Sequence, residues 1–314
     1  MSDRMTAEPI FALQVPSPFP EGRTQVYVIA SDPITIVDAG VATERAFDAL
    51  VSGLAGHGLA PGDIKRIVLT HKHIDHIGNA WRIREQSAAE IFIHESEVEA
   101  LRDVDPSGEE FGGLVRERLL DWNVPAAVLP DTSQTFQWAI EPADATQLAD
   151  GMRLPTAEGE LEVIHTPGHT LGSVCLRFGQ SLFSGDHVLP DISPNIGGGD
   201  MRRRGLLEHY FNSLRKIAGL VGDGVQVFPG HGMPFSGLRE RCDALIRHHE
   251  QRLEQIVRIL DRRDPQTVYE VARKLFGTLE GFHVVLGCAE AASHLEYLAD
   301  RGLVVEESGR YVLP

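Results

Sequence analysis

The sequence has little cysteine and no pair of cysteines at metal-binding spacing. Its three cysteines, Cys175, Cys242 and Cys288, stand far apart among 314 residues. Isolated cysteines of this kind are typical of buried apolar side chains in a reducing compartment. The N-terminus lacks the apolar segment of a secretory signal, and no apolar run approaches the length of a membrane span. We therefore expect a cytoplasmic protein with no membrane partner.

Positive charge is also scarce. Lys and Arg together number 29 and Asp and Glu 45, so that the net charge is −16 at pH 7. A field of this sign repels phosphate at long range, which argues against non-specific binding to nucleic acid or to anionic membranes. The net charge does not exclude a local basic patch. The length of the chain is sufficient for a full core and a second small domain.

Histidine and aspartate, in contrast, are concentrated in one short stretch, Thr70-His71-Lys72-His73-Ile74-Asp75-His76. Residues 66–70 before it predict a buried strand, and residues 75–87 after it carry apolar side chains at helical spacing. The stretch therefore lies on a strand-to-helix loop, where side chains can converge. Imidazole and carboxylate together are typical ligands of zinc or a related divalent ion. The alternative interpretation is a solvated, histidine-rich loop.

Polar residues also follow three later predicted strands. His169 stands in Thr166-Pro167-Gly168-His169-Thr170, Asp186 in Ser184-Gly185-Asp186-His187, and His231 in Pro229-Gly230-His231-Gly232. Neighbouring glycines allow the backbone to turn sharply at each strand end. A single histidine after a Pro-Gly turn is usually structural, but the repeated pattern indicates a shared site.

The predicted elements alternate between strand and helix, which is typical of an α/β fold. Residues 95–145 interrupt this order with helical stretches, and this insertion either shapes a substrate pocket or decorates the surface. A long helix follows over residues 236–260. Two further helices and a hairpin, over residues 262–314, resemble a winged helix.

Together these motifs resemble the motif series of the metallo-β-lactamase superfamily, from residue 10 to residue 236. The early Val37-Asp38-Ala39-Gly40 matches as well. The resemblance implies an α/β (α+β) fold, an αββα sandwich of two facing sheets with helices outside. The implied domains are a catalytic domain over 1–236, a connecting helix over 237–261 and a winged-helix-like domain over 262–314.

The resemblance also implies roles for individual residues. The first metal ion would be held by His71, His73 and His169, the second by Asp75, His76 and His231, and Asp186 would bridge them. Asp38 would orient a ligand histidine without being a ligand itself. Asp75 is the expected catalytic residue, which orients a metal-bridging hydroxide and later passes a proton to the leaving group. The implied cofactors are two divalent ions, zinc first, with iron or manganese as alternatives.

Aspartate at position 186 and histidine at position 76 resemble the glyoxalase II, lactonase and nuclease branches of the superfamily. The implied reaction is hydrolysis of a thioester, ester or lactone. The glutathione-binding helical C-terminus of glyoxalase II is absent, which leaves the substrate open. The short segment between Asp186 and His231 argues against the RNA-processing nucleases that carry a large insertion there.

Three alternatives remain. Some superfamily members with a C-terminal winged helix are endoribonucleases, so a phosphodiesterase acting on RNA is the main one. The charges argue against it, because residues 262–314 hold six Lys and Arg against eight Asp and Glu, a net charge of −2. A mononuclear iron dioxygenase is the second alternative. A non-catalytic binding module is the third, and the complete ligand set argues against it. These predictions are compatible with a homodimer.

Contacts to a small-molecule substrate are predicted near the bridging aspartate. Arg202, Arg203 and Arg204 follow a run of three glycines and could bind a carboxylate or phosphate, or form salt bridges on the surface. His187 and Tyr210 are candidates for contacts to the oxyanion or leaving group, or are core residues. His248 and His249 are interpreted as surface or interhelix residues rather than ligands.

Overall fold

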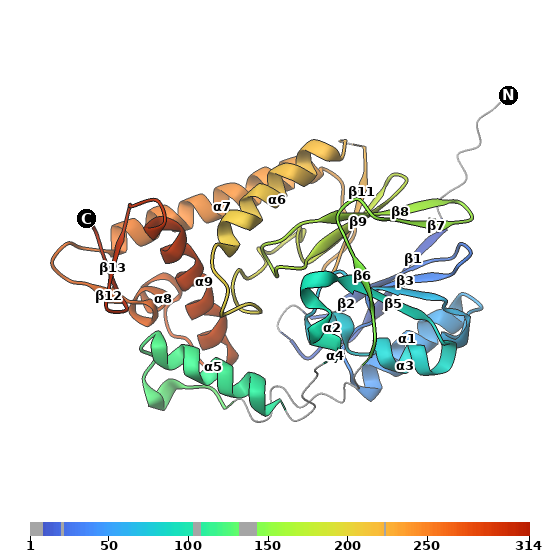
Figure 1. Ribbon diagram of the computed structural model, residues 1–314, viewed down its shortest axis with the longest axis horizontal. Coiled ribbons are helices and arrows are strands. Elements are labelled where there is room, and N and C mark those ends of the chain that lie inside the picture. Colours follow the sequence, from blue (N-terminus) through green and yellow to red (C-terminus); the bar gives the residue numbers. More distant parts are fainter. Residues whose placement is uncertain (1–8, 20–21, 103–107, 132–142, 223) are drawn as a thin grey trace.

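Two β-sheets face each other and carry helices on their outer surfaces (Figure 1). The computed structural model describes residues 9–19, 22–102, 108–131, 143–222 and 224–314. The first sheet has the strand order β1 (Ile10–Val15), β2 (Thr24–Ile29), β3 (Thr35–Val37), β4 (Arg66–Val68), β5 (Glu90–His94) and β6 (Thr146–Leu148). The second has the order β11 (Gln226–Pro229), β10 (Ser181–Gly185), β9 (Val174–Phe178), β8 (Gly159–His165) and β7 (Arg153–Thr156).

Both sheets are mixed. In the first, β1, β2 and β3 pair antiparallel, and β3 to β6 pair parallel. In the second, only β10 and β11 pair parallel. The helices are α1 (Glu44–Gly56), α2 (Ile74–Ile77), α3 (Ala80–Ser87), α4 (Glu99–Arg102), α5 (Glu109–Asp121), α6 (Leu206–Leu220), α7 (Leu238–Ile259), α8 (Val268–Phe276) and α9 (Phe282–Ala299).

Three hydrophobic clusters separate the layers. Because successive side chains of a strand point to opposite faces, Ile36 packs outward against α1, whereas Val37 packs inward against the second sheet. On the second sheet Phe183 points inward and Leu182 points outward, toward α6 and α7. Helix, sheet, sheet and helix therefore form successive layers, which confirms the predicted αββα sandwich.

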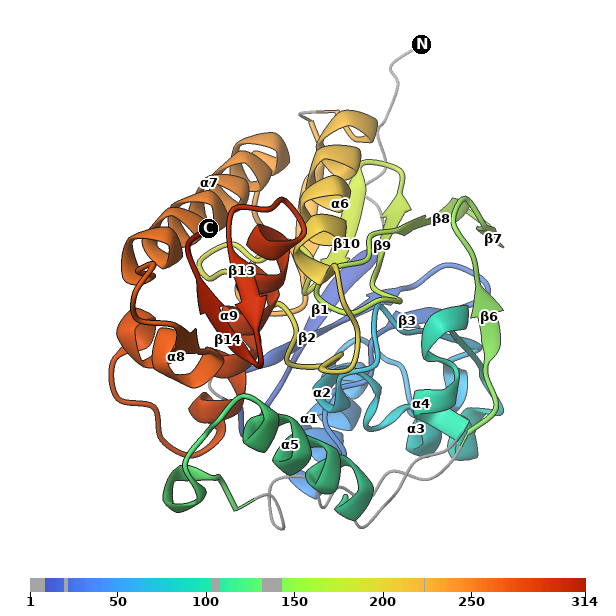
Figure 2. The ribbon, with the colours of Figure 1, turned by 60° about the vertical axis from the view of Figure 1, so that its left-hand side comes forward.

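The predicted helical insertion contains α4 and α5, and part of it, including residues 105–107 of its predicted turn, lies outside the described residues. Helix α5 lies against α9, so the insertion reaches the C-terminal part of the chain (Figures 1 and 2). Among the helices of the described residues, none is both long and apolar enough to cross a membrane.

The C-terminal part contains the two helices and the hairpin that the sequence predicted (Figure 2). Thr267 caps α8 by accepting a hydrogen bond from Glu270 N, while the Glu270 carboxylate accepts one from Thr267 N. Strands β13 (Val305–Glu307) and β14 (Arg310–Val312) form the hairpin. A third strand, β12 (Gln266–Thr267), pairs with β14 and is too short for a sequence pattern to reveal. Helices α8 and α9 share one hydrophobic cluster with α6 and α7.

Candidate metal centre

Seven side chains meet at one edge of the sandwich, five from loops and two, Asp75 and His76, from the short helix α2. The loops follow β4, β8, β10 and β11, and their ligand atoms form two groups, within each of which all atoms lie within 4.8 Å of one another. The first group is His71, His73, His169 and Asp186, and the second is Asp75, His76 and His231. The structure therefore brings together every residue that the resemblance implied as a metal ligand.

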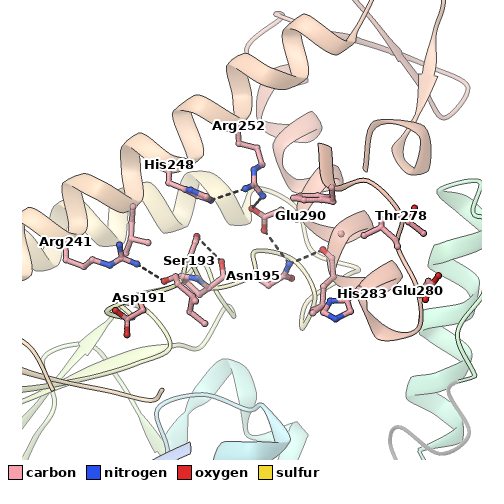
Figure 3. A pocket seen from close by; sticks show the side chains of 17 residues that line it. Asp191, Ser193, Asn195, Arg241, His248, Arg252, Thr278, Glu280, His283 and Glu290 are labelled. Atoms are coloured by element: carbon pink, nitrogen blue, oxygen red, sulfur yellow. Dashed lines mark hydrogen bonds and ion pairs between the residues drawn. The ribbon is translucent and has the colours of Figure 1, made fainter. Parts of the chain in front are cut away.

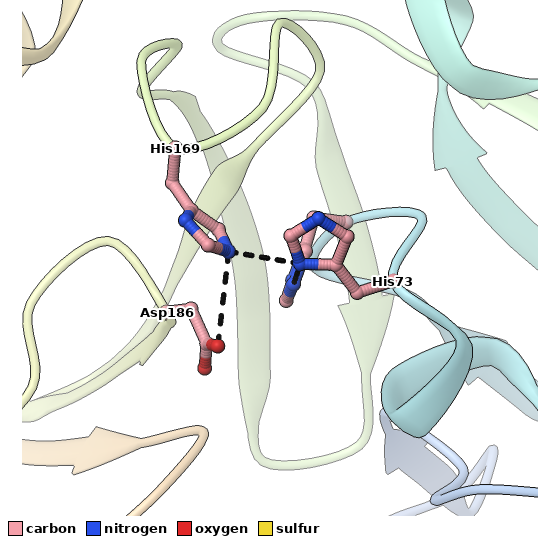
Figure 4. A group of neighbouring side chains, drawn as sticks. His73, His169 and Asp186 are labelled. Atoms are coloured by element: carbon pink, nitrogen blue, oxygen red, sulfur yellow. Dashed lines mark hydrogen bonds and ion pairs between the residues drawn. The ribbon is translucent and has the colours of Figure 1, made fainter. Parts of the chain in front are cut away.

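The first group has three ring nitrogens in close contact. His73 Nδ1 lies 3.0 Å from His71 Nε2 and 2.9 Å from His169 Nε2 (Figure 4). Asp186 Oδ2 lies 3.8 Å from His169 Nε2. Glycine is required beside this group, because a Cβ at Gly199 would lie 2.3 Å from His73 Nε2.

Hydrogen bonds on the outer nitrogens show which way the lone pairs of this group point. His169 Nδ1 donates to the carbonyl oxygen of Asn195 at 2.8 Å, because a carbonyl can only accept. His71 Nδ1 donates to Thr70 Oγ1 at 3.1 Å, since that hydroxyl itself donates to Asp38. Both Nε2 atoms therefore present lone pairs to His73 Nδ1, and a single hydrogen on Nδ1 cannot satisfy both. A cation at this point can.

The second group follows the same rule. His76 Nδ1 donates to Asp38 Oδ2 at 2.8 Å, and His231 Nδ1 donates to the carbonyl oxygen of Arg23 at 3.1 Å. The inner Nε2 of His231 then faces Asp75 Oδ2 at 3.2 Å and Asp186 Oδ2 at 3.4 Å. His76 Nε2 and Asp186 Oδ1 are buried and have no hydrogen-bond partner among the described residues. In their neutral forms these rings present lone pairs to carboxylates, and this arrangement fits a second divalent ion.

The electrostatics of the two groups differ. Burial, together with the neighbouring His169, lowers the pKa of His73 to about 3, so its ring is a neutral donor of a lone pair. Burial would also lower the pKa of His231, but Asp186 and Asp75 raise it to about 10. Burial opposes ionisation of Asp75, yet His76 and His231 lower its pKa to about 2. The second group thus requires positive charge, and a metal ion that binds there displaces the protons.

Asp38 lies behind His76. Its Oδ1 accepts from Thr70 N at 2.8 Å, and its Oδ2 accepts from Thr70 Oγ1 and from His76 Nδ1. The side chain is buried, so three hydrogen bonds hold both the carboxylate and the imidazole in place. It contacts a ligand from behind, as the resemblance implied, and a partner of this kind fixes the tautomer and the ring orientation of a metal-binding histidine.

Sequence reasoning missed the residues that support these ligands from a distance. The Asn195 carbonyl holds His169, and Asp200 joins two ligand loops by accepting from Lys72 Nζ at 2.5 Å and from Leu171 N at 2.8 Å. Glu97 accepts from Gly172 N at 2.9 Å and so supports the same turn. The glycine run at 197–199 was the only signal of a close approach, and it did not indicate a partner.

The predicted substrate-binding residues lie in two different environments. Arg202 and Arg204 are exposed and form ion pairs with Glu117 at 3.0 Å and Asp300 at 3.7 Å. Arg203 is also exposed. His187 and Tyr210 are buried, and the Tyr210 hydroxyl donates to the carbonyl oxygen of His187 at 3.0 Å. Contact of these five residues with a substrate stays a prediction.

Glu97 makes the stability of this region pH-dependent. Burial raises the pKa of its carboxyl group above the ordinary 4.5, although Lys72 opposes the rise. The folded protein therefore binds this proton more tightly than the unfolded chain, so the contribution of Glu97 to stability falls as pH rises through the raised pKa. We expect Glu97→Gln to remove this fall. Urea unfolding of the metal-free native and variant proteins at several pH values measures it, and identical pH profiles would contradict it.

The fold and the site together define a protein of the αββα sandwich class with a histidine- and aspartate-rich metal centre at one edge. Residues 20–231 match the family described as the Metallo-beta-lactamase superfamily. The chain belongs to this superfamily. Its resemblance to the superfamily, inferred from the motifs, is thus confirmed.

The relatives found by comparison extend beyond the matched domain. The chain is 29% identical to a Bacillus subtilis protein described as probable metallo-hydrolase YqjP, over 94% of this chain and 93% of that protein. It is 26% identical to a Caenorhabditis elegans protein described as a beta-lactamase-like protein 2 homolog, over 83% and 73% of the two chains. The crystal structure of a metallo-beta-lactamase family protein from Thermus thermophilus, TTHA1429, is 30% identical with a TM-score of 0.84, over 98% and 99%.

Proposed function

We propose that this protein is a metal-dependent hydrolase that acts on a thioester, ester or lactone with two divalent ions in the centre. The position of Asp186 carries the proposal, since its carboxylate faces His169 in the first group and His76 and His231 in the second. The description of the B. subtilis relative as a probable metallo-hydrolase supports the reaction class.

The donor set favours zinc, and iron or manganese are alternatives because nitrogen and oxygen ligands suit all three ions. Two ions held here would polarise a carbonyl oxygen and bring the pKa of a bound water to about 7. The protein supplies their ligands and the buried surroundings.

Asp75 is the proposed catalytic residue. Its carboxylate is ionised at neutral pH, accepts from Thr24 Oγ1 at 3.3 Å, and lies beside His231 Nε2. A buried carboxylate at this position can orient a water molecule and accept its proton. The same group then transfers the proton to the leaving group. For an anionic substrate, we propose contacts from Arg202, Arg203 and Arg204.

The second candidate function is phosphodiester hydrolysis of RNA, which the winged-helix-like order of the C-terminal elements favours. The charges there oppose it. Arg301 pairs with Glu208 at 3.2 Å, and Arg310 pairs with Glu270 at 3.4 Å. Glu290, on the helix that would enter a groove, is buried against the catalytic domain. We therefore propose a packing role for these helices, a small-molecule substrate and no nucleic-acid partner.

The test is a substrate panel on metal-replete protein, with thioesters, lactones, aryl esters, phosphodiesters and single-stranded RNA. We expect turnover of a carbonyl substrate that is lost in Asp75→Asn, and no cleavage of RNA. The exposed Asp48 on α1 provides the control, because Asp48→Asn should keep full activity.

Cleavage of RNA that Arg262→Glu and Arg263→Glu abolish would establish the nuclease function instead. Substitution is preferable to deletion of residues 262–314. The deletion would expose the hydrophobic cluster that α8 and α9 share with α6 and α7, and the remaining protein would lose stability.

A further inference from the structure

A third group of metal-binding side chains lies between α7 and α9, outside the centre described above. His249 comes from α7, and Glu290 and His294 stand one turn apart on α9. The exposed fractions are 0%, 4% and 0%, so solvent does not compensate any of the three groups. The superfamily motifs include none of these residues.

The atoms of this group are spaced like those of the metal centre. His249 Nδ1 lies 3.1 Å from His294 Nε2, and Glu290 Oε1 lies 3.6 Å and 3.8 Å from these two nitrogens. Ligands at about 2.1 Å from a tetrahedral zinc ion stand roughly 3.4 Å apart. In the recognised centre, neighbouring donor atoms stand between 2.9 Å and 3.8 Å apart. The two sets of distances agree.

The outer nitrogens have the partners that metal-binding histidines usually have. His294 Nδ1 donates to the carbonyl oxygen of Glu290 at 2.7 Å, so the Nε2 of a neutral ring presents its lone pair to the group. His249 Nε2 lies 3.1 Å from Ser193 Oγ, which can accept its hydrogen and leave Nδ1 bare. Each ring is thereby oriented toward Glu290.

The charge of this group supports a cation. Burial lowers the pKa of His249 to about 2 and that of His294 to about 3, so both rings are neutral. Burial raises the pKa of Glu290 to about 7, although Ile196 N donates to Oε2 and Arg252 Nη1 lies 3.4 Å from Oε1. A metal ion would compensate this carboxylate more fully than one guanidinium does.

The group borders a pocket of about 970 Å³ through Glu290. The pocket lies between the loop of residues 191–195, α7 and the helices α8 and α9, and both Glu290 and Ser193 line it (Figure 3). Figure 3 shows Glu290 beside Arg252 and Asn195 at the pocket wall. The site is therefore buried without being sealed, which a metal site requires for loading.

We propose that His249, Glu290 and His294 bind a single divalent transition-metal ion of the zinc type, with a structural role. The ion would join α7 to α9 and fix the Glu290 carboxylate. The other oxygen of that carboxylate, Oε2, accepts from Ile196 N at 3.0 Å. Residue 195, the neighbour of Ile196, holds His169 by its carbonyl, so the site supports the loop beside the catalytic metals.

Zinc titration followed by elemental analysis tests the proposal. We expect the native protein, after zinc loading and gel filtration, to retain three ions per chain. His249→Gln and His294→Gln should each retain two. His283→Gln should retain three, because His283 is exposed at the same pocket and is not a member of the group. In His73→Ala, the third ion should survive although the catalytic centre loses metal.

A native protein that retains no more ions than His249→Gln and His294→Gln retain would overturn the proposal, whether its catalytic centre holds one ion or two. So would a third ion that persists in both His249→Gln and His294→Gln. The variants could also lose stability although the native protein binds no third ion. The group would then contain a buried hydrogen bond from His249 Nδ1 to His294 Nε2 instead of a metal ion. Cobalt loading of His73→Ala gives an independent readout, because tetrahedral cobalt absorbs visible light strongly. If this absorption is lost in the His73→Ala/His294→Gln variant, the ion is bound at the group.

Discussion

Replacing Asp186 with alanine is expected to lower kcat/KM on the carbonyl substrate by roughly 10³-fold, or about 4 kcal/mol. The carboxylate faces ligands of both groups, at 3.8 Å from His169 and 3.4 Å from His231. Without it, neither ion keeps its full set of oxygen and nitrogen ligands. We therefore expect the metal content of the catalytic centre to fall from two ions to one or none, as elemental analysis measures it.

The exposed Asp48→Asn again provides the control, because it removes one carboxylate of the same type from the outer face of α1. Far-ultraviolet circular dichroism of the Asp186→Ala variant checks that the sandwich still folds. Retention of both catalytic ions, together with native kcat/KM, would refute the assignment of Asp186 as the shared ligand.

Adding one methyl group at Gly230 is expected to disrupt the same centre without removing any ligand. A Cβ at this position would lie 2.2 Å from Asp186 Oδ1 and 2.8 Å from His76 Cε1, so both ligands must move. We expect Gly230→Ala to weaken metal binding by roughly 10–100-fold, as for loss of a residue that orients ligands. Overpacking should also destabilise the metal-free protein by about 1–3 kcal/mol. Competition with a chelator and urea unfolding measure the two effects.

Gly219 provides the matched control for this change. It lies in α6 with open space around it, since a Cβ there would meet no heavy atom within 4 Å. Gly219→Ala should leave metal affinity unchanged and raise stability by up to about 1 kcal/mol, because alanine favours the helix. Equal metal affinity in Gly230→Ala and Gly219→Ala would show that the close approach at Gly230 does not constrain the ligands.

The candidate metal ligands could be proposed from the sequence because they stand in motifs that follow strands. His71 and His73 follow β4, Asp186 follows β10, and His231 follows β11. A short apolar strand that ends in glycine and a polar residue is recognisable in the sequence. Several such strand ends that meet at one sheet edge form a site. Thr43 and Thr267 cap α1 and α8, and this pattern is local as well, because capping depends on residues three positions apart.

The supporting residues could not be predicted in this way. Asn195 acts through its backbone carbonyl, which every residue has, so its side chain carries no signal of the contact to His169. Asp200 and Lys72 are distant in sequence and form an ion pair only because two loops fold over each other. Spacing rules describe neighbours within one element and contain no information about which loops meet.

The sequence by itself indicated the sandwich and its family through motifs that resemble those of the superfamily, and it implied seven candidate metal ligands, because strand-end motifs are local properties of the chain. Only the tertiary structure decided which side chains of α9 are buried against α7. In sequence, His249 is interpreted as a surface or interhelix residue rather than a ligand, but packing of α9 on α7 buries it together with Glu290 and His294. Burial removes the water that would otherwise solvate these groups, and the resulting need for a partner arises only from the folded arrangement.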